Sequence, residues 1–464
     1  MFPKQFFGWL LATLLALTTG PTPAYTAPFV IDNVDHPAGT YTGTQLSLAY
    51  LQLFNYTYIS YYDATHHTLK LAYNTGFSQQ VTCNGVPGYW TCLTLDGNGS
   101  NGTSTDDVGM YSSVDVTTVA FVGVGVSYYD ATHQAVKYAQ YACAFICQPP
   151  VVETVSDPGP GLIAGSYGTA LKYDKNGNPY IAYSYTNPTD HAQDALMIAH
   201  RVTSGGNCGD GASYGKWQCD KIDQGDRVGQ YPSLSLHDYG STLLQLAYLG
   251  AGNVLHYAIS TGGTCVSGGA SPWSCMHIDQ GYGEVAIVSH NAIPAIAYYD
   301  RTGGNLRFAT SVGTQTYANC GKNASNQNTW RCDDIESIGA GLAHASLSMA
   351  LDAAGLPAIA YRRTPSIGPA ELRLARPIGA YNIDPGNCGP PPYGGLGFEP
   401  NWWCSSVDGG GANTDEAAFT GIGIRPNGLA VIAYTEDDNY NGASRLMVAR
   451  QQIFYASYLP FVRR

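Results

Sequence analysis

The sequence predicts an all-β chain that folds as a seven-bladed β-propeller with four-stranded antiparallel blades. The first observation is a short phrase, an aliphatic residue followed by Ser or Ala and then Tyr, which returns seven times at a spacing of about 60 residues. This regularity indicates an internal repeat, which sets the architecture before any single motif is considered. The copies begin at Ile59, Val126, Ile181, Leu246, Ile296, Ile359 and Ile432.

The second observation is that each copy lies inside a unit of four short runs. An alternating run precedes it and ends in a turn rich in Asp, Gly and Pro, as at residues 346–357. A Leu/Val-x-apolar-Ala run follows it, and then a run that starts Trp-x-Cys and ends in an acid, as at 217–223. Strands of this composition between turn residues form an antiparallel meander. Repeated meanders bury their faces against one another, and closure into a ring also hides their edges.

The third observation concerns the two ends of the mature chain. Seven copies of the first three strands are followed by only six copies of the Cys-bearing fourth strand. Residues 29–35 match 217–223 position by position, with Phe in place of Trp and Ile in place of Cys. We therefore expect residues 29–35 to pair with 446–449 and complete the seventh blade, which ties the ring shut noncovalently.

The ends of the chain outside the repeats resemble processing segments. Residues 1–24 are predicted to be a secretory signal, with Lys4 at its start, an apolar segment at 6–17 and a small-residue cleavage site. The propeller then occupies 25–450, and the mature product is expected to be secreted or held at the cell surface. The tail at 451–464 is interpreted as an extra edge strand or frayed end, with a sorting or attachment signal as the alternative.

Composition limits the partners. Charged residues make up 12% of the chain and the formal net charge is −12. A surface of this charge disfavours nucleic acid and anionic membranes, so no nucleic-acid partner is expected. No segment after the signal is long and apolar enough to be transmembrane. The oligomeric state is left open.

The twelve cysteines fall into six close pairs, one in each of six units. No spacing brings four ligands together as in a zinc site, and a Cys-x-x-Cys redox motif is absent. The sequence therefore predicts six local disulfides that staple third strands to fourth strands, each contributing about 2–3 kcal/mol. The pairs are Cys83/Cys92, Cys143/Cys147, Cys208/Cys219, Cys265/Cys275, Cys320/Cys332 and Cys388/Cys404.

The loops between second and third strands supply the candidates for binding. In a propeller these loops gather on one face around the axis, together with the loops that join one unit to the next. Aromatic rings that stack on a sugar and carboxylates that accept from its hydroxyls suit carbohydrate recognition. The alternative is that the acids start Asx turns while the tyrosines pack between blades. The candidates are Tyr62, Asp63, Tyr129, Asp130, Tyr299 and Asp300.

A catalytic site needs a base, an acid and a charge stabiliser within reach of one bond. The irregular loops offer His191, Arg362, Arg363 and Glu436, with solvated loop charge as the alternative. No metal ligand set and no cofactor are predicted. The acids that end the fourth strands are interpreted as caps of the following turns, with a structural cation in the central channel as the alternative.

The phrases at 295–300 and 355–361 resemble the repeats of secreted bacterial β-propellers in the broad sialidase-like, or neuraminidase-repeat, group. The resemblance spans all seven units. The Asp-box of that group, Ser-x-Asp-x-Gly-x-Thr-Trp, is missing, and its arginine triad and Tyr/Glu pair match no residues in this chain. No sialidase activity is therefore carried over, although the resemblance implies that some propellers of this kind are polysaccharide lyases and others bind glycans.

Regular repeats without a unique catalytic constellation favour a binding module that recognises a glycan or a surface protein through the loop face. One alternative is an enzyme that cleaves polysaccharide on the same face, either a lyase or a glycoside hydrolase. The other alternative is a structural surface protein.

Overall fold

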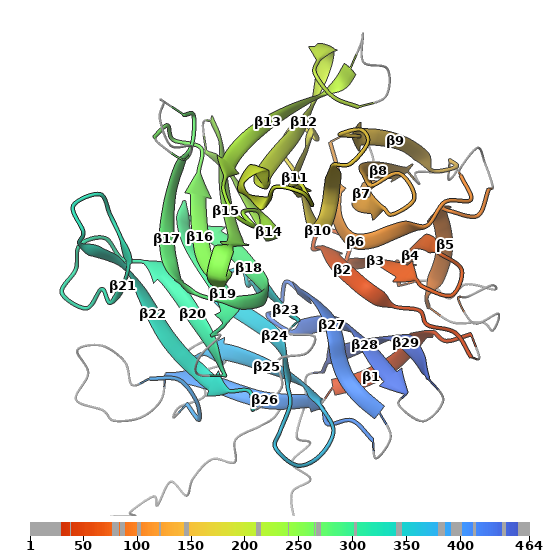
Figure 1. Ribbon diagram of the computed structural model, residues 1–464. Coiled ribbons are helices and arrows are strands. Elements are labelled where there is room, and N and C mark those ends of the chain that lie inside the picture. Colours follow the sequence, from red (N-terminus) through yellow and green to blue (C-terminus); the bar gives the residue numbers. More distant parts are fainter. Residues whose placement is uncertain are drawn as a thin grey trace, which may run out of the picture.

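The computed structural model describes residues 29–452 except 38, 77–82, 84–88, 100–103, 120–121, 143–147, 210–214, 240, 264, 266–270, 301–303, 340–345, 379–385, 391–400, 412–413 and 439–441. Seven antiparallel sheets surround a central axis, so the predicted seven-bladed propeller is confirmed (Figure 1). The predicted signal at 1–24, the tail beyond residue 452 and the pair Cys143/Cys147 lie outside the described residues.

The first three blades use the chain in order. Blade 1 contains β2 (Thr44–Leu51), β3 (Tyr56–Asp63), β4 (Thr68–Asn74) and β5 (Thr91–Asp96). Blade 2 contains β6 (Val108–Thr117), β7 (Gly123–Asp130), β8 (Ala135–Ala142) and β9 (Val151–Ser156). Blade 3 contains β10 (Ile163–Tyr173), β11 (Pro179–Thr186), the 3-10 helix η2 (His191–Gln193), β12 (Ala195–Gly206) and β13 (Gly215–Gln224).

The next three blades repeat this order. Blade 4 contains β14 (Gln230–Tyr239), β15 (Ser241–Gly250), the 3-10 helix η3 (Ala251–Asn253), β16 (Val254–Ile259) and β17 (Ser274–Gln280). Blade 5 contains β18 (Tyr282–His290), β19 (Ile293–Tyr299), β20 (Asn305–Ser311), β22 (Asn328–Ser337) and a short fifth strand, β21 (Cys320–Lys322). Blade 6 contains β23 (Leu347–Leu351), β24 (Pro357–Arg363), β25 (Glu371–Pro377) and β26 (Trp402–Asp408).

Blade 7 joins the two ends of the chain. It contains β27 (Thr414–Ile424), β28 (Ala430–Asp438) and β29 (Ala443–Gln451), and β1 (Phe29–Asp35) is its outermost strand. Strand β1 runs antiparallel to β29, with Phe29 opposite Gln451 and Ile31 opposite Ala449. In Figure 1 this red strand lies among the blue strands of the last blade. The predicted closure by the N-terminal segment is therefore confirmed.

The repeated phrase occupies the second strand of each blade, which is buried on both faces. In β3, Ile59 and Tyr61 point to one side and Ser60 to the other, and all three are fully buried. Successive side chains of a strand point to opposite faces, so both faces of this strand meet a neighbouring blade. The small Ser or Ala in the middle of the phrase lets the next blade approach closely.

In six of the seven blades the tyrosine of the phrase also attaches the blade to the one before it. Its hydroxyl donates to the acid that ends the fourth strand of the preceding blade, and six blades make this contact. The pairs are Tyr61 with Asp35, Tyr128 with Asp96, Tyr248 with Asp223, Tyr298 with Asp279, Tyr361 with Glu336, and Tyr434 with Asp408.

The predicted turn-capping role of these acids is confirmed for three of them. Asp96, Asp223 and Asp408 each accept a backbone N–H from a residue one or two positions further along the chain. Because they end the outermost strands, they lie away from the central channel. Sequence analysis missed their second role, the contact between blades, because the partner is a residue of the next unit.

Disulfides staple the outer strands as predicted. Five of the six pairs lie within the described residues, and each bonds the two cysteines of its own unit: Cys83–Cys92, Cys208–Cys219, Cys265–Cys275, Cys320–Cys332 and Cys388–Cys404. The tryptophans beside them pack against the preceding blade, as Trp217 does against Tyr138 with ring centroids 5.5 Å apart. Among the described residues, no helix combines the length and the apolar character needed to cross a bilayer.

Candidate functional site

The loops between second and third strands open onto one face of the propeller, which we call the loop face. In most blades the first, innermost strand begins at this face with a β-bulge. The register shifts after Thr44 in blade 1, after Met110 in blade 2 and after Gln230 in blade 4. Three bulged residues take a left-handed backbone, Gln45 (φ 48°), Tyr111 (φ 52°) and Tyr231 (φ 51°). This conformation is costly for a bulky residue and tends to occur at functional sites, where a bulge re-aims a side chain.

The residues at these bulges line a cavity of about 380 Å³ at the loop-face end of the central channel. Deeper in, the channel encloses about 280 Å³ and is lined by small residues of the inner strands, including Ser47, Ser113 and Ser233. Six side chains, each from a different blade, define what we call the channel mouth: Gln45, Tyr111, Tyr231, Glu284, Ser346 and Phe419.

Glu284 supplies the carboxyl group of the channel mouth. The hydroxyl of Ser346 donates to Glu284 Oε2 at 2.7 Å. Burial raises the pKa of Glu284 to about 7, although the hydrogen bonds from Ser346 and from the backbone of Leu347 oppose the shift. Ser346 is itself held in place, because the Tyr299 hydroxyl donates to its carbonyl oxygen at 2.8 Å.

The channel mouth contains two tyrosines, one from blade 2 and one from blade 4. Burial raises the pKa of Tyr111, and it raises the pKa of Tyr231 to about 12, with the charge of Glu284 contributing to both. Both phenols therefore remain hydrogen-bond donors at ordinary pH. The backbone N–H of Tyr111 donates to Gln45 Oε1 at 2.7 Å, which fixes the amide beside it.

The six predicted binding residues lie on the loop face, but their side chains are buried and much of their polar capacity is used within the protein. Asp63 Oδ1 accepts the N–H groups of Thr65 and His66, both at 3.2 Å, and its Oδ2 contacts His66 Nδ1 at 2.9 Å. The Tyr62 hydroxyl donates to Asp107 at 2.7 Å. This is the Asx-turn geometry that the sequence offered as the alternative.

The other predicted binding residues follow the same pattern. Asp130 accepts the N–H of His133 at 3.0 Å, and Tyr129 is buried beside it. Tyr299 is fully buried and holds Ser346, and Asp300 is 9% exposed. A ligand contact by these residues stays a prediction, and Tyr299 reaches the channel mouth through its hydrogen bond to Ser346.

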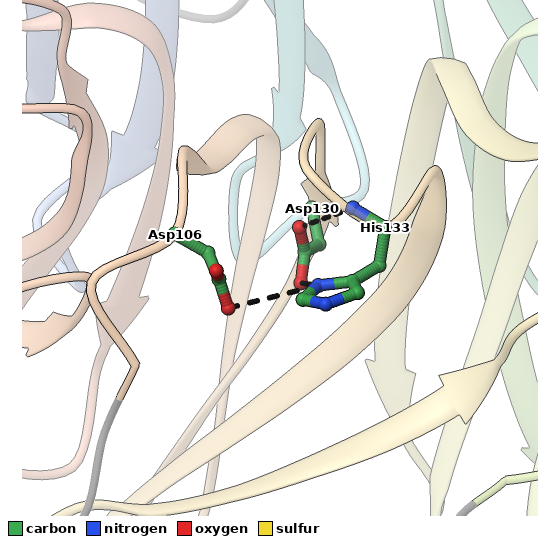
Figure 2. A group of neighbouring side chains, drawn as sticks. All are labelled: Asp106, Asp130 and His133. Carbon is green, nitrogen blue, oxygen red and sulfur yellow. Dashed lines mark hydrogen bonds and ion pairs between the residues drawn. The ribbon is translucent and has the colours of Figure 1, made fainter.

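One group on the loop face has the composition of a metal site. Asp106, Asp130 and His133 place one ligand atom each within 4.8 Å of one another, and Figure 2 shows both acids beside the imidazole. His133 Nδ1 lies 3.0 Å from Asp130 Oδ2 and 3.6 Å from Asp106 Oδ2. The Lys137 ammonium lies 3.6 Å from the same Asp130 oxygen and already balances its charge.

The candidate catalytic residues are distributed over three blades. His191 lies in η2 of blade 3, with Nδ1 at 3.0 Å from Asp194 Oδ2. In blade 6, Arg362 Nη2 lies 3.9 Å from Asp415 Oδ2. His191 is therefore tied to an acid of its own blade and Arg362 to an acid of blade 7, rather than to another candidate.

The other two candidates form ion pairs within their own blades. Arg363 pairs with Glu371 at 2.7 Å in blade 6, and Glu436 pairs with Arg445 at 2.6 Å in blade 7. Glu436 faces Glu416, whose pKa is raised to about 9 by burial and by the neighbouring negative charges. The sequence offered solvated loop charge as the alternative for these residues, and the structure places them in ion pairs. A catalytic role stays a prediction.

The sequence predicts the strands that carry the residues of the channel mouth, but it does not single out those residues. They do not form a motif, since Gln45, Tyr111, Tyr231 and Glu284 include three residue types. The signal that could have found them is their common position, immediately before the alternating run that opens each unit.

No protein-family model and no curated protein sequence matches the chain. Several solved structures are similar to it in fold. AofleA from Arthrobotrys oligospora is 10% identical, with a TM-score of 0.45 over 83% of this chain and 94% of that one. The fucose-specific lectin from Aleuria aurantia is 12% identical, with a TM-score of 0.40 over 78% of this chain and 100% of that one. The endosialidase of phage phi92 is 9% identical, with a TM-score of 0.45 over 94% of this chain and 71% of that one.

Proposed function

We propose that this chain is an exported carbohydrate-binding protein that holds a glycan at the channel mouth. The observation that carries the proposal is the convergence of two phenols, one phenyl ring, an amide, a hydroxyl and a carboxyl around one cavity. Flat rings pack on the apolar faces of sugars, and the polar groups between them set which hydroxyls are accepted. The left-handed backbone of Gln45, Tyr111 and Tyr231 also supports a binding site, because strained backbone conformations cluster at functional sites.

The charge of the molecule favours neutral sugars. The formal net charge is −12, and the mouth presents the carboxyl of Glu284. A sulfated or sialylated glycan would bring a second negative charge towards this group, which disfavours its binding. Neutral hexoses and N-acetylhexosamines are therefore the expected ligands.

A glycan array probed with the chain lacking residues 1–24 tests the proposal. We expect binding to neutral glycans, and Tyr231→Ala should weaken it at least about tenfold because a packing face for the sugar is lost. Tyr89→Ala is the matched control, since Tyr89 is exposed in blade 1 away from the mouth. An array on which no glycan binds would overturn the proposal and favour a structural surface protein.

The enzyme alternative is supported by one observation. Glu284 is the one acid among the six side chains of the channel mouth, and its raised pKa suits a general acid. Incubation of the protein with soluble polysaccharides, followed by assay of new reducing ends and of unsaturated products, distinguishes the two functions. A binding protein forms neither, a glycoside hydrolase forms new reducing ends alone, and a lyase forms both. Either activity should be lost in Glu284→Gln.

Export is proposed from the predicted signal at 1–24 together with the observed disulfides, because such bonds persist in oxidising compartments. The intact mass of protein recovered from the culture medium tests it. The expected mass corresponds to a chain that begins near residue 25, and retention of the full chain inside the cell would contradict it.

A further inference from the structure

Blade 3 departs from the other blades next to the channel mouth. Its bulge is longer, because residues 165–168 of β10 stand opposite the single residue Ser184 of β11. The equivalent bulge of blade 1 places only residues 45–46 opposite one residue. The extra length displaces the chain at Tyr167, whose backbone N–H donates to Ser184 Oγ at 2.9 Å.

A separate cavity of about 360 Å³ opens beside this bulge. Its lining combines apolar groups, two hydroxyls and two rings, and every residue comes from blade 3. We call this cavity the blade-3 pocket, and it is lined by Ile163, Ser166, Tyr167, Thr186, Pro188 and His191.

The blade-3 pocket adjoins the central channel through one shared side chain. Tyr167 lines both cavities. Its ring packs edge-on against Tyr231 of the channel mouth, with centroids 6.4 Å apart. A ligand that lies over Tyr231 therefore meets Tyr167 next, and the pocket lies on the other side of that ring.

Hydrogen bonds hold the polar wall of the pocket in place. Asp194, which is 2% exposed, accepts the N–H of Asn187 at 2.7 Å and contacts His191 Nδ1 at 3.0 Å. Asp190 caps η2 by accepting the N–H of Ala192 at 3.2 Å. Because a carboxylate only accepts, His191 Nδ1 carries the proton and Nε2 of the neutral ring is an acceptor.

We propose that the blade-3 pocket is a second sugar subsite, and that the ligand is a neutral oligosaccharide whose terminal unit occupies the channel mouth while a following unit lies against Tyr167 and His191. The proposal rests on the proposed carbohydrate-binding function. It explains why the second-to-third-strand loop of blade 3 carries η2 and an imidazole fixed by a buried acid. His191 then accepts from a sugar hydroxyl and Tyr167 supplies a packing face for its ring.

A chain-length series tests this subsite. The probes are methyl glycosides of glucose, galactose, mannose, fucose and N-acetylglucosamine, and the di-, tri- and tetrasaccharides that end in the same units, titrated by calorimetry. The wild-type protein should bind the longer probes at least about tenfold more tightly than the matching methyl glycoside. His191→Ala should remove most of this gain while the affinity for the methyl glycoside changes less than about twofold. Tyr167→Ala should remove the gain as well and also weaken binding of the methyl glycoside, because its ring packs against Tyr231.

His66→Ala is the matched control, because His66 also holds its Nδ1 against an aspartate, at 2.9 Å from Asp63, but lines neither cavity. It should leave the whole series unchanged. His191→Gln, with thermal melts of every variant, separates loss of the acceptor from loss of the fold.

The two proposals fail in different ways. Equal affinity for short and long probes, or a full length-dependent gain in His191→Ala, overturns the second subsite and leaves the channel mouth in place. Failure of every probe to bind overturns the carbohydrate-binding function and this inference with it.

Discussion

Glu284 shows how a single residue differentiates a repeated fold. The first strands of the blades line the channel, yet among the described residues of the mouth only Glu284 of blade 5 carries a carboxyl group. Ser346 of the adjacent blade donates to it at 2.7 Å, and burial raises its pKa to about 7. The proton is thus held more tightly by the folded chain than by the unfolded one, in which this carboxyl has a pKa near 4.5.

This shift predicts a pH dependence of stability. The contribution of Glu284 to the free energy of unfolding is fully present below about pH 4.5. It is lost as the pH rises through about 7, since the charged carboxylate is poorly solvated in the fold. Glutamine does not titrate, so Glu284→Gln removes that loss. The midpoint temperature of thermal unfolding of the variant should therefore rise relative to that of the wild type between about pH 5 and pH 8. Thermal melts across this range measure the difference, and a constant difference would contradict the assignment.

Glu371 provides a comparison of opposite sign. Burial raises its pKa, but the hydrogen bond from Arg363 and the charge of Arg373 outweigh burial and bring the pKa below its usual value. Its stabilisation is therefore present above the unfolded pKa and lost as the pH falls through the folded one. Glu371→Gln should cost stability at neutral pH and progressively less in acid.

At the scale of the elements, the hydroxyl of the repeat tyrosine determines how one blade is attached to the next. Tyr128 of β7 donates to Asp96 of β5 at 2.7 Å, and Lys137 pairs with the same carboxylate at 2.8 Å. Blade 3 is the exception, because Ser156 takes the place of the acid opposite Tyr183. Blade 3 therefore serves as a control for how much the tyrosine–acid hydrogen bond stabilises the protein.

We predict that Tyr128→Phe destabilises the protein by about 1.5–3 kcal/mol, the usual cost of losing a hydrogen bond to a charged group. Tyr183→Phe removes a hydroxyl from the same position of the fold but leaves no acid behind, and it should cost less than about 1.5 kcal/mol. Urea unfolding of both variants gives the comparison. Equal costs would show that the acid contributes nothing at this interface.

The disulfides act at the same scale, on single hairpins. Replacing Cys320 and Cys332 together by Ser opens a loop of 12 residues between β21 and β22 in blade 5. The expected loss is about 2–3 kcal/mol in urea unfolding without reductant, because the unfolded chain regains loop entropy. Peptide mapping of the unreduced wild type should also recover Cys143 joined to Cys147, and a bond from either cysteine to another unit would contradict the predicted pairing.

For the whole molecule, the closing strand β1 contributes to two blades. It pairs with β29 of blade 7, while its last residue, Asp35, is fully buried and accepts from Tyr61 of blade 1 at 2.7 Å. Lys70 of blade 1 pairs with the same carboxylate. One strand therefore joins the first and last blades through both its backbone and its terminal side chain.

Asp35→Ala should cost about 3–5 kcal/mol, because it leaves the Lys70 ammonium without its main counter-charge in a buried place. Asp32→Ala is the matched control within the same strand. Asp32 pairs with Arg450 at 2.7 Å where both side chains are partly exposed, and such a pair is worth about 0–1 kcal/mol. Thermal and urea unfolding measure the stability of both variants. Similar losses of stability would show that the junction between blades 7 and 1 depends on the backbone pairing of β1 alone.

Much of the fold followed from the periodic part of the sequence. The Ile-Ala-Tyr phrase, the Trp-x-Cys runs and the match of residues 29–35 to 217–223 are local patterns, and strands, hairpins and neighbouring disulfides depend on local chemistry. The candidate site was less accessible. Predicted residues such as Asp63 and Asp130 stand out in sequence because turns need them, and the structure uses them in turns.

The sequence by itself determined that there are seven blades, which cysteines pair within the described units, and that the N-terminal strand closes the ring. Only the tertiary structure decided that Tyr111, Tyr231 and Glu284, separated by up to 173 residues, line one cavity. The physical reason is that ring closure brings the start of every inner strand to the axis. Each bulge then directs a side chain into the channel mouth, and the residues next to it in sequence do not indicate that position.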